Sequence, residues 1–166
     1  MKLKLSSFSK EKQIVRSNLS LESLGLDENG LTDPVKVEVI TDKNNSCLTV
    51  ECKIEVNTKY DCDRCLEPFD SVLHTSISFI ITSDSHMKAD TDEVIFVTSG
   101  DDEVDITKKI RDAILLAVPY KKVCSPDCQG LCSSCGKNLN EGPCDCKDQN
   151  IDPRWEKLKK LKKMED

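Results

Sequence analysis

No stretch of the sequence is apolar for long enough to cross a bilayer, and this absence is the first constraint on the class of protein. A transmembrane helix needs roughly 20 consecutive apolar residues, and no run among the 166 residues approaches that length. Residues 1–7 lead into polar sequence without the apolar core and cleavage site of a secretory signal. We therefore expect a cytoplasmic protein with reduced thiols, whose ten cysteines do not form a disulfide framework.

Signatures of catalysis are also missing. The six glycines are scattered and form no phosphate-cradling loop, and the sequence contains no nucleophile elbow and no H-E-x-x-H. Only two histidines occur, and neither His74 nor His86 has a second histidine at ligand spacing, so we expect both at the surface. The sequence predicts a protein that is not an enzyme.

Both ends of the chain are rich in basic residues, although its formal net charge is −6. A C-terminal helix is predicted from Pro153, because proline suits the first helical position and Trp155, Leu158 and Leu161 recur every third residue. Its basic side chains are the candidate nucleic-acid ligands: Arg154, Lys157, Lys159, Lys160, Lys162 and Lys163. A charge run is more often a solvated surface, and that alternative stays open.

Alternation of apolar and polar residues predicts most of the strands. It is cleanest over 48–60, continues in phase over 69–81, and occurs again over 35–40 and 94–97. The first two segments predict a long antiparallel hairpin with its tip at 62–68. Cys47 and Cys52 lie singly in this strand sequence, so we expect small core or half-buried residues.

One helix is predicted after the strands, with Asp105 as its cap and Pro119 at its end. The fold class is therefore α+β: an antiparallel sheet or barrel-like core with a long hairpin, one packed helix, and a C-terminal cysteine-rich zinc segment followed by a helix. We expect a core domain over 1–120 and a metal-binding segment with a basic helix over 121–166.

Cysteine is the residue that the chain has in abundance. Six thiols fall within 23 residues, in a segment too polar to pack a core: Cys124, Cys128, Cys132, Cys135, Cys144 and Cys146. Their spacing predicts one closed four-thiolate site for Zn²⁺, which would supply the folding free energy. Cys132 and Cys135 form one pair, and the second pair is either Cys144 with Cys146 or Cys124 with Cys128. An iron–sulfur cluster is an alternative, although the ferredoxin spacing is absent.

A second C-x2-C, Cys62 with Cys65, lies at the expected hairpin tip. Three interpretations stay open: a redox dithiol with Arg64 lowering a thiol pKa, shared zinc ligation, or a purely structural tip. Redox chemistry is disfavoured because thioredoxin-like motifs begin a helix, whereas strands flank this one.

These motifs together resemble the YceD family, the large ribosomal RNA subunit accumulation proteins. The resemblance rests on Cys62-x2-Cys65 before Pro68-Phe69, on the helix ending in Leu115-Leu116-Ala117-Val118-Pro119, on the run from Cys124 through Gly130-Leu131-Cys132-x2-Cys135-Gly136-x-Asn138-Leu139-Asn140 to Cys144-x-Cys146, and on Asp152-Pro153-Arg154. Ser133 stands where relatives often have proline.

The resemblance implies a non-enzymatic factor that supports the accumulation or processing of large-subunit (23S) rRNA and ribosome assembly. Its implied partners are large-subunit rRNA or its precursor, a ribosomal protein, or both, with no small-molecule substrate. Two alternatives come from other classes: a zinc-ordered adaptor between proteins, and a thiol redox protein acting through Cys62 and Cys65.

Overall fold

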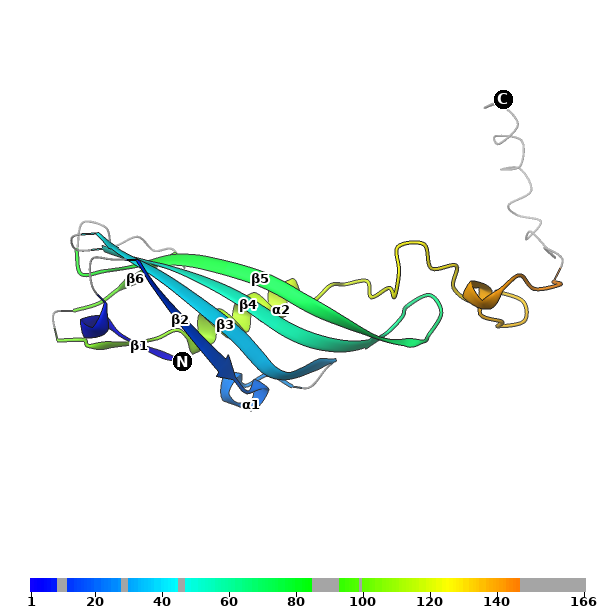
Figure 1. Cartoon of the computed structure of the whole chain (residues 1–166), viewed down its shortest axis with the longest axis horizontal. Helices are drawn as coiled ribbons and strands as arrows, with labels where there is room; N and C mark the ends of the chain where they lie inside the picture. Colours follow the sequence, from blue (N-terminus) through cyan, green and yellow to red (C-terminus); the bar gives the residue numbers. More distant parts are fainter. Residues whose placement is uncertain (9–11, 28–29, 45–46, 85–92, 99, 147–166) are drawn as a thin grey trace, which may run out of the picture. The chain divides into compact units, whose positions relative to one another are not determined.

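The computed structural model describes residues 1–8, 12–27, 30–44, 47–84, 93–98 and 100–146 (Figure 1). Its strands are β1 (Lys2–Lys4), β2 (Gln13–Leu19), β3 (Leu31–Asn44), β4 (Cys47–Asp61), β5 (Pro68–Thr82), β6 (Val94–Phe96) and β7 (Glu103–Asp105). Its helices are α1 (Leu21–Leu24) and α2 (Thr107–Ala117), with 3-10 turns η1 (Leu5–Ser7) and η3 (Leu139–Glu141). The α+β class predicted from the sequence is confirmed.

Five strands form the main sheet in the order β2-β3-β4-β5-β6. All neighbouring pairs are antiparallel except β5 and β6, which run parallel. Strands β4 and β5 pair along their whole length, from Cys47 opposite Thr82 to Asp61 opposite Pro68. Within the described residues the sheet is open rather than closed into a barrel, because β2 and β6 form its two edges.

The alternating residues of β4 divide its two faces as the sequence predicts. Val50, Cys52, Ile54 and Val56 are buried, while the residues between them are exposed or half-buried. The apolar face packs under α2, which lies along one side of the sheet in Figure 1. The long hairpin predicted for 48–81 is therefore confirmed, with one face in the core and one face in water.

Helix α2 buries one stripe of its surface. Ile110 and Ile114 are fully buried with Ala113, and the preceding Ile106 is also fully buried. The N-cap position is Ile106 rather than the predicted Asp105, which lies one residue earlier and accepts a hydrogen bond of 2.9 Å from the N–H of Thr107 at its Oδ1. The helix ends at Ala117, two residues before Pro119. The helix itself lies where the sequence places it.

The N-terminal region contains strands that alternation did not reveal. Strand β2 pairs with β3 although both Ile14 and Val15 are exposed, so its edge position leaves no clean apolar face. Strand β3 begins at Leu31, four residues before the predicted start at 35, and its register shifts between Thr32 and Lys36. The strand passes Pro34 at this irregularity, where a proline is tolerated.

The described contacts divide the chain into two compact units. Unit 1 comprises Met1–Asp61 and Pro68–Lys122, and unit 2 comprises Cys62–Glu67 together with the chain from Val123 onward. The sequence analysis divided the chain at 120 and left the hairpin tip in the first domain, whereas the contacts place Cys62–Glu67 in the second unit. No helix among the described residues is long and apolar enough to traverse a bilayer.

Candidate metal centres

Eight of the ten cysteines converge in unit 2 as two groups of four. Site 1 comprises Cys62, Cys65, Cys124 and Cys128, and site 2 comprises Cys132, Cys135, Cys144 and Cys146. Within each group all sulfur atoms lie within 4.8 Å of one another. The sequence analysis expected one four-thiolate site among the six C-terminal cysteines. Both candidate second pairs are used, each in a different group, and Cys62 and Cys65 complete site 1.

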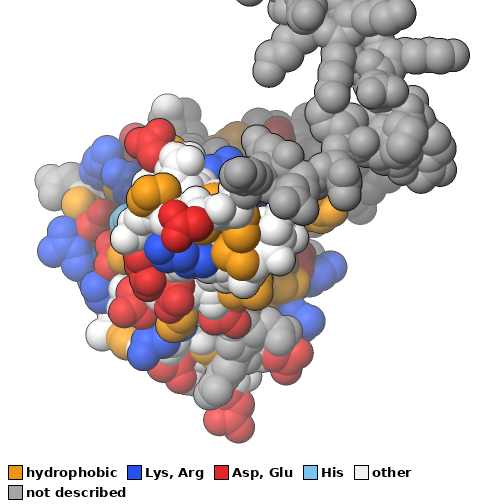
Figure 2. Space-filling view, turned by 90° about the vertical axis from the view of Figure 1, so that its right-hand side faces the viewer, with side chains coloured by type: hydrophobic (Ala, Val, Ile, Leu, Met, Phe, Trp, Pro, Cys, Tyr) orange, Lys and Arg blue, Asp and Glu red, His pale blue; other side chains and the backbone are white. Residues whose placement is uncertain are grey.

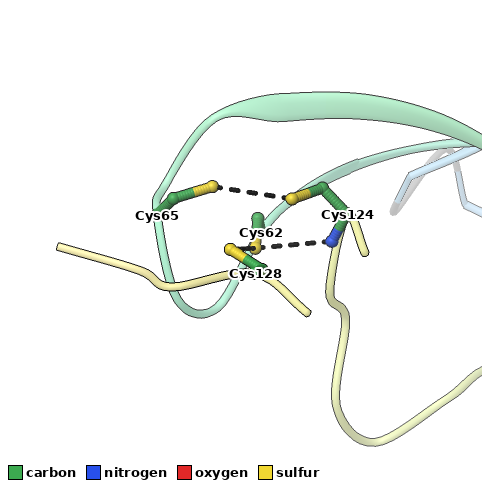
Figure 3. Close-up of side chains that lie close together, drawn as sticks. All are labelled: Cys62, Cys65, Cys124 and Cys128. Carbon is green, nitrogen blue, oxygen red and sulfur yellow. Dashed lines mark hydrogen bonds between the residues drawn. The ribbon is translucent and has the colours of Figure 1, made fainter. Parts of the chain in front are cut away.

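Site 1 joins the tip of the β4–β5 hairpin to the start of the C-terminal cysteine run. The four thiols point toward a common centre (Figure 3). Cys62 Sγ lies 3.8 Å from Cys128 Sγ, and Cys65 Sγ lies 3.7 Å from Cys124 Sγ. Tetrahedral Zn²⁺ with Zn–S bonds of about 2.3 Å requires sulfurs about 3.8 Å apart. The donor set therefore fits a tetrahedral metal ion.

The two C-x2-C segments have the same backbone geometry. In site 1 the Arg64 N–H lies 3.5 Å from Cys62 Sγ, and in site 2 the Ser134 N–H lies 3.4 Å from Cys132 Sγ. The N–H groups of Leu66 and Gly136 each donate to the carbonyl of the first cysteine, at 2.9 Å in both sites. Backbone N–H groups aimed at a sulfur stabilise its thiolate, which is the form that binds metal.

Both turns require a left-handed residue after the second cysteine. Gly136 has φ of 73° and Leu66 has φ of 60°. Leu66 is the one described non-glycine residue with positive φ, and its side chain is exposed. A left-handed conformation brings the Cβ atom close to the following carbonyl oxygen and so raises the free energy of any residue other than glycine. The turn therefore holds Leu66 under strain.

Arg64 connects the hairpin tip with the chain from Val123 within unit 2. Its Nη1 donates to the carbonyl oxygens of Pro126 at 3.1 Å and Cys128 at 2.8 Å. Its own carbonyl accepts from the Leu131 N–H at 3.1 Å. A Cβ at Gly130, where φ is +74°, would lie 3.0 Å from that carbonyl oxygen, so glycine permits the close approach.

The two sites differ in exposure. Three cysteines of site 1 are at most 5% exposed and the fourth, Cys124, is exposed, whereas site 2 has no buried cysteine. Site 1 draws its ligands from two distant parts of the chain, and site 2 takes all four from 132–146. Site 1 is therefore the more enclosed, non-local group and site 2 the more open, local one.

Hydrogen bonds within site 1 shift the pKa values of its thiols in opposite directions. Burial raises the pKa of Cys62, but the N–H groups of Cys124, Cys65 and Arg64 outweigh it and bring that pKa from 9.0 to about 6. The Asn140 amide lowers the pKa of Cys128. A hydrogen bond to Cys128 raises the pKa of Cys124 to about 12, so Cys124 keeps its proton near neutral pH.

Site 2 repeats this pattern. The N–H groups of Cys135 and Ser134 lower the pKa of Cys132 to about 6. A hydrogen bond to Cys135 raises the pKa of Cys146 to about 12. Each group thus holds thiolate character and residual protons together, and a soft divalent cation that displaced those protons would satisfy all four sulfurs.

The remaining cysteines and His74 match their predictions. Cys52 is buried and Cys47 half-buried, and desolvation raises the pKa of Cys52 to about 12. His74 lies on the solvent face of β5, with Nδ1 3.9 Å from Glu55 Oε2. His86 and the predicted C-terminal helix, with Arg154, Lys157, Lys159, Lys160, Lys162 and Lys163, lie outside the described residues.

The solvent face of the main sheet has a hollow of about 650 Å³ lined by charged residues of β2 to β5. Arg16 pairs with Glu38 at 2.8 Å, and Lys36 with Glu55 at 2.7 Å. The hydrogen bond and the positive charge of Lys36 lower the pKa of Glu55. Both carboxylates are therefore paired with cations of a neighbouring strand.

The described surface has no uniform sign in the view of Figure 2, where basic and acidic side chains are interspersed. This matches a chain with 24 basic and 30 acidic residues. Charge on this face therefore does not define a nucleic-acid interface, and the cysteine groups remain the most specific chemistry among the described residues.

Comparison with known proteins now places the chain. The family model described as "Large ribosomal RNA subunit accumulation protein YceD" matches residues 50–162, and the chain belongs to this family. That region includes the β4–β5 hairpin, α2 and all eight cysteines of the two sites. No solved structure matches the chain.

Relatives with curated sequences come from bacteria and plants. An uncharacterized protein of Mycobacterium tuberculosis strain H37Rv is 31% identical over 144 residues, which are 86% of this chain and 67% of the relative. The chloroplastic large ribosomal RNA subunit accumulation protein YCED homolog 1 is 28% identical in Zea mays and 24% in Arabidopsis thaliana. These alignments cover 81% and 79% of this chain, but only 57% and 49% of the plant proteins.

The sequence analysis did not predict two residues that contact the candidate metal ligands or the backbone around them, Arg64 and Asn140. Arg64 was considered only as a charge near a thiol, and its contacts with the carbonyls of Pro126 and Cys128 depend on tertiary proximity. Asn140 was noted only as part of the family motif, yet its Nδ2 lies 3.3 Å from Cys128 Sγ. Its position between the cysteine pairs of site 2, in a segment with few apolar residues, was the available signal.

Proposed function

We propose that this protein is a non-enzymatic factor that supports the accumulation of large-subunit rRNA in the cytoplasm, by acting on precursor processing or ribosome assembly. The carrying observation is the family match over residues 50–162, together with plant relatives named for large ribosomal RNA subunit accumulation.

Both cysteine sites are proposed to hold Zn²⁺. Four thiolates at tetrahedral spacing favour zinc, and the absence of histidine or carboxylate from either group favours closed, structural sites. Zinc would displace the protons retained by Cys124 and Cys146 and order a segment with little apolar burial of its own. The centres would then present unit 2 as a rigid surface to a partner.

The contact with large-subunit precursors is proposed to involve the basic side chains of residues 154–163. Lysine and arginine neutralise phosphates and release counterions, so binding should weaken with salt by a log–log slope of very roughly 0.7 to 0.9 per phosphate contact. A ribosomal protein is the second candidate partner. An adaptor that binds only protein would show no such salt dependence.

The test combines crosslinking in cells, sequencing of attached RNA, and sedimentation with ribosomal particles. The parent protein should crosslink to large-subunit rRNA or its precursor and co-sediment with large-subunit precursors. A variant with Lys159, Lys160, Lys162 and Lys163 replaced by Gln should associate less and show a flatter salt dependence, while keeping the aliphatic stems.

Three results would contradict parts of this proposal. Normal large-subunit rRNA levels after depletion of the protein would remove the rRNA role. Unchanged association of the quadruple variant at every salt concentration would remove the C-terminal contact and leave the Cys62–Glu67 tip as the next candidate. Thiol–disulfide exchange at Cys62 and Cys65 in metal-free protein purified under reducing conditions would favour the redox alternative.

A further inference from the structure

The segment that carries site 2 also contacts a ligand of site 1. Between Cys135 and Cys144 the chain forms the 3-10 turn η3, and Asn140 lies within that turn. Its Nδ2 lies 3.3 Å from Cys128 Sγ, although Cys128 belongs to the other cysteine group. A side chain from the loop between the site 2 ligands therefore contacts a ligand of site 1.

The orientation of the Asn140 amide follows from its other partners. The Gln129 N–H points at Asn140 Oδ1 at 2.8 Å, and a backbone N–H can only donate, so this atom must be the oxygen. The Nδ2 group then donates one hydrogen to Asn138 Oδ1 at 2.9 Å and the other to Cys128 Sγ. All the strong hydrogen-bonding positions of the amide nitrogen are used, and the donor faces the sulfur.

Backbone contacts hold η3 against the chain around Cys128. The Leu139 N–H donates to the Gly130 carbonyl at 2.8 Å, and Leu131 forms an isolated bridge with Asn138. Cys132, which follows Leu131 in the sequence, is a site 2 ligand and donates its N–H to the Lys137 carbonyl at 2.8 Å. One short hydrogen-bonded segment thus runs from Cys128 of site 1 through Asn140 to the ligands of site 2.

Few side chains in this segment are buried, so apolar packing does not fix the position of η3. None of the residues Cys132–Cys146 is fully buried. A metal ion in site 2 would tie Cys132 and Cys135 to Cys144 and Cys146 and so restrict the loop that contains Asn140. The conformational entropy of placing the amide against Cys128 would then already be lost when site 1 binds metal.

We propose that Asn140 is a positioning residue that couples the two sites, so that metal in site 2 raises the metal affinity of site 1. The inference rests on the proposed metal binding. The coupling is reciprocal, because linked binding equilibria change each other's affinity by the same factor. Removal of an outer hydrogen bond to a metal ligand typically weakens metal affinity by about 10- to 100-fold, which sets the expected size.

The experiment titrates metal-stripped, full-length protein with Co²⁺, whose absorption in tetrahedral thiolate sites reports binding, and repeats the titration with Zn²⁺ against a competing chelator. A variant with Cys65→Ser and Cys124→Ser retains only site 2. A variant with Cys144→Ser and Cys146→Ser retains only site 1. These two proteins give the affinity of each site alone, and the parent gives both together.

Asn140 is tested with two substitutions. Asn140→Asp keeps the acceptor for the Gln129 N–H and removes the donor to Cys128, while Asn140→Ala removes both without adding charge. Glu141→Gln is the matched control, because Glu141 lies in the same turn and its side chain is exposed. Each change is made in the parent and in both proteins that retain a single site.

The coupling predicts that site 1 binds metal about 10- to 100-fold more weakly when site 2 is destroyed, and similarly when Asn140 is replaced. The two effects should not add, since both remove the same hydrogen bond. Glu141→Gln should match the parent. The affinity of isolated site 2 for Co²⁺ should survive Asn140→Ala within a few-fold, which separates lost coupling from a misfolded segment.

Two sites that bind independently in the parent would overturn the coupling and leave the metal assignment intact. Unchanged site 1 affinity in both Asn140 variants, or fully additive losses, would overturn the role of Asn140. Parent protein that binds neither Co²⁺ nor Zn²⁺ would overturn the metal assignment itself, and the coupling with it.

Discussion

Units 1 and 2 are ordered by different kinds of interaction. Unit 1 buries an apolar face, with Ile106, Ile110 and Ile114 fully enclosed beside the valines of β3 and β4. Unit 2 has little apolar surface to bury, and eight of its side chains converge as two groups of four thiols. The comparison teaches that one chain can contain a fold that its side chains stabilise directly and a second unit that the proposed metal ions would order.

Metal removal should have the largest effect and should divide the two units. We expect about two equivalents of zinc in protein purified under reducing conditions without added metal, one per cysteine group, rather than the single equivalent that one site would give. After chelation, the amide hydrogens of Leu66, Cys132 and Gly136 should exchange rapidly, because the turns they close would no longer be held.

The amides of β4 in unit 1, such as that of Val50, are the internal control for this measurement. They should stay protected after chelation, because their strand pairing and burial do not involve the metal. Loss of protection at Val50 together with Gly136 would mean that unit 1 has no independent fold. Visible iron charge-transfer absorption would contradict zinc.

The reverse test disturbs unit 1 alone. Ile110→Ala removes a fully buried side chain from α2 and should lower the free energy of unfolding by about 2–5 kcal/mol. Leu116→Ala is the matched control, since this leucine is 88% exposed on the same helix and its loss should change stability by at most about 0.5 kcal/mol. Chemical denaturation followed by circular dichroism measures both. Equal effects would refute the assigned core face of α2.

Cys132→Ser should remove metal from site 2 while unit 1 keeps its melting transition. The substitution replaces a thiolate whose pKa is lowered to about 6 with a hydroxyl that does not bind zinc as a thiolate does. Limited proteolysis should show new cleavage after Lys137, which is exposed in the loop between the site 2 ligands. If the whole chain unfolded instead, the cysteine segment would belong to the main core.

A smaller effect should separate two glycines with the same backbone conformation. Gly130→Ala and Gly136→Ala each place a Cβ at positive φ, at a cost of about 1–2 kcal/mol. Only the alanine at 130 would also press against the Arg64 carbonyl, at 3.0 Å, whereas nothing lies within 4 Å at 136. Co²⁺ affinity of site 1 should therefore fall more for Gly130→Ala. Equal losses at both positions would mean that the close approach at Gly130 contributes nothing.

The parts of the fold that were predictable are those that repeat. The alternation in β4 and the apolar stripe of α2 each involve many residues, so one face could be assigned from spacing alone. Strand β2 gave no such pattern because both faces at Ile14 and Val15 are exposed at a sheet edge. The start of β3 was predicted too late because Pro34 indicates a boundary before the strand. The register shift beside Pro34 accommodates the proline within the strand.

The sequence predicted the chemistry of the candidate site, but not how the cysteines divide between two groups. Thiol density predicted candidate metal ligands that lie together in the structure, and C-x2-C spacing identified both turns. The assignment of Cys62 and Cys65 to the same centre as Cys124 and Cys128 depends on a tertiary approach that no local spacing encodes. Arg64 and Asn140 were missed for the same reason, since their contacts join segments distant in the sequence or in different loops.

The wide sequence separation of the site 1 ligands gives this centre a topological consequence. Cys65 and Cys124 are 59 positions apart, and the intervening chain contains β5, β6, β7 and α2. A metal complex that holds both cysteines closes this stretch into a ring. In the chain-entropy account of cross-links, closing a ring of this size lowers the conformational entropy of the unfolded chain. The loss raises the free energy of unfolding by about 4 kcal/mol. While it stays bound, the ion would restrict the unfolded conformations of unit 1 without touching any of its folded side chains.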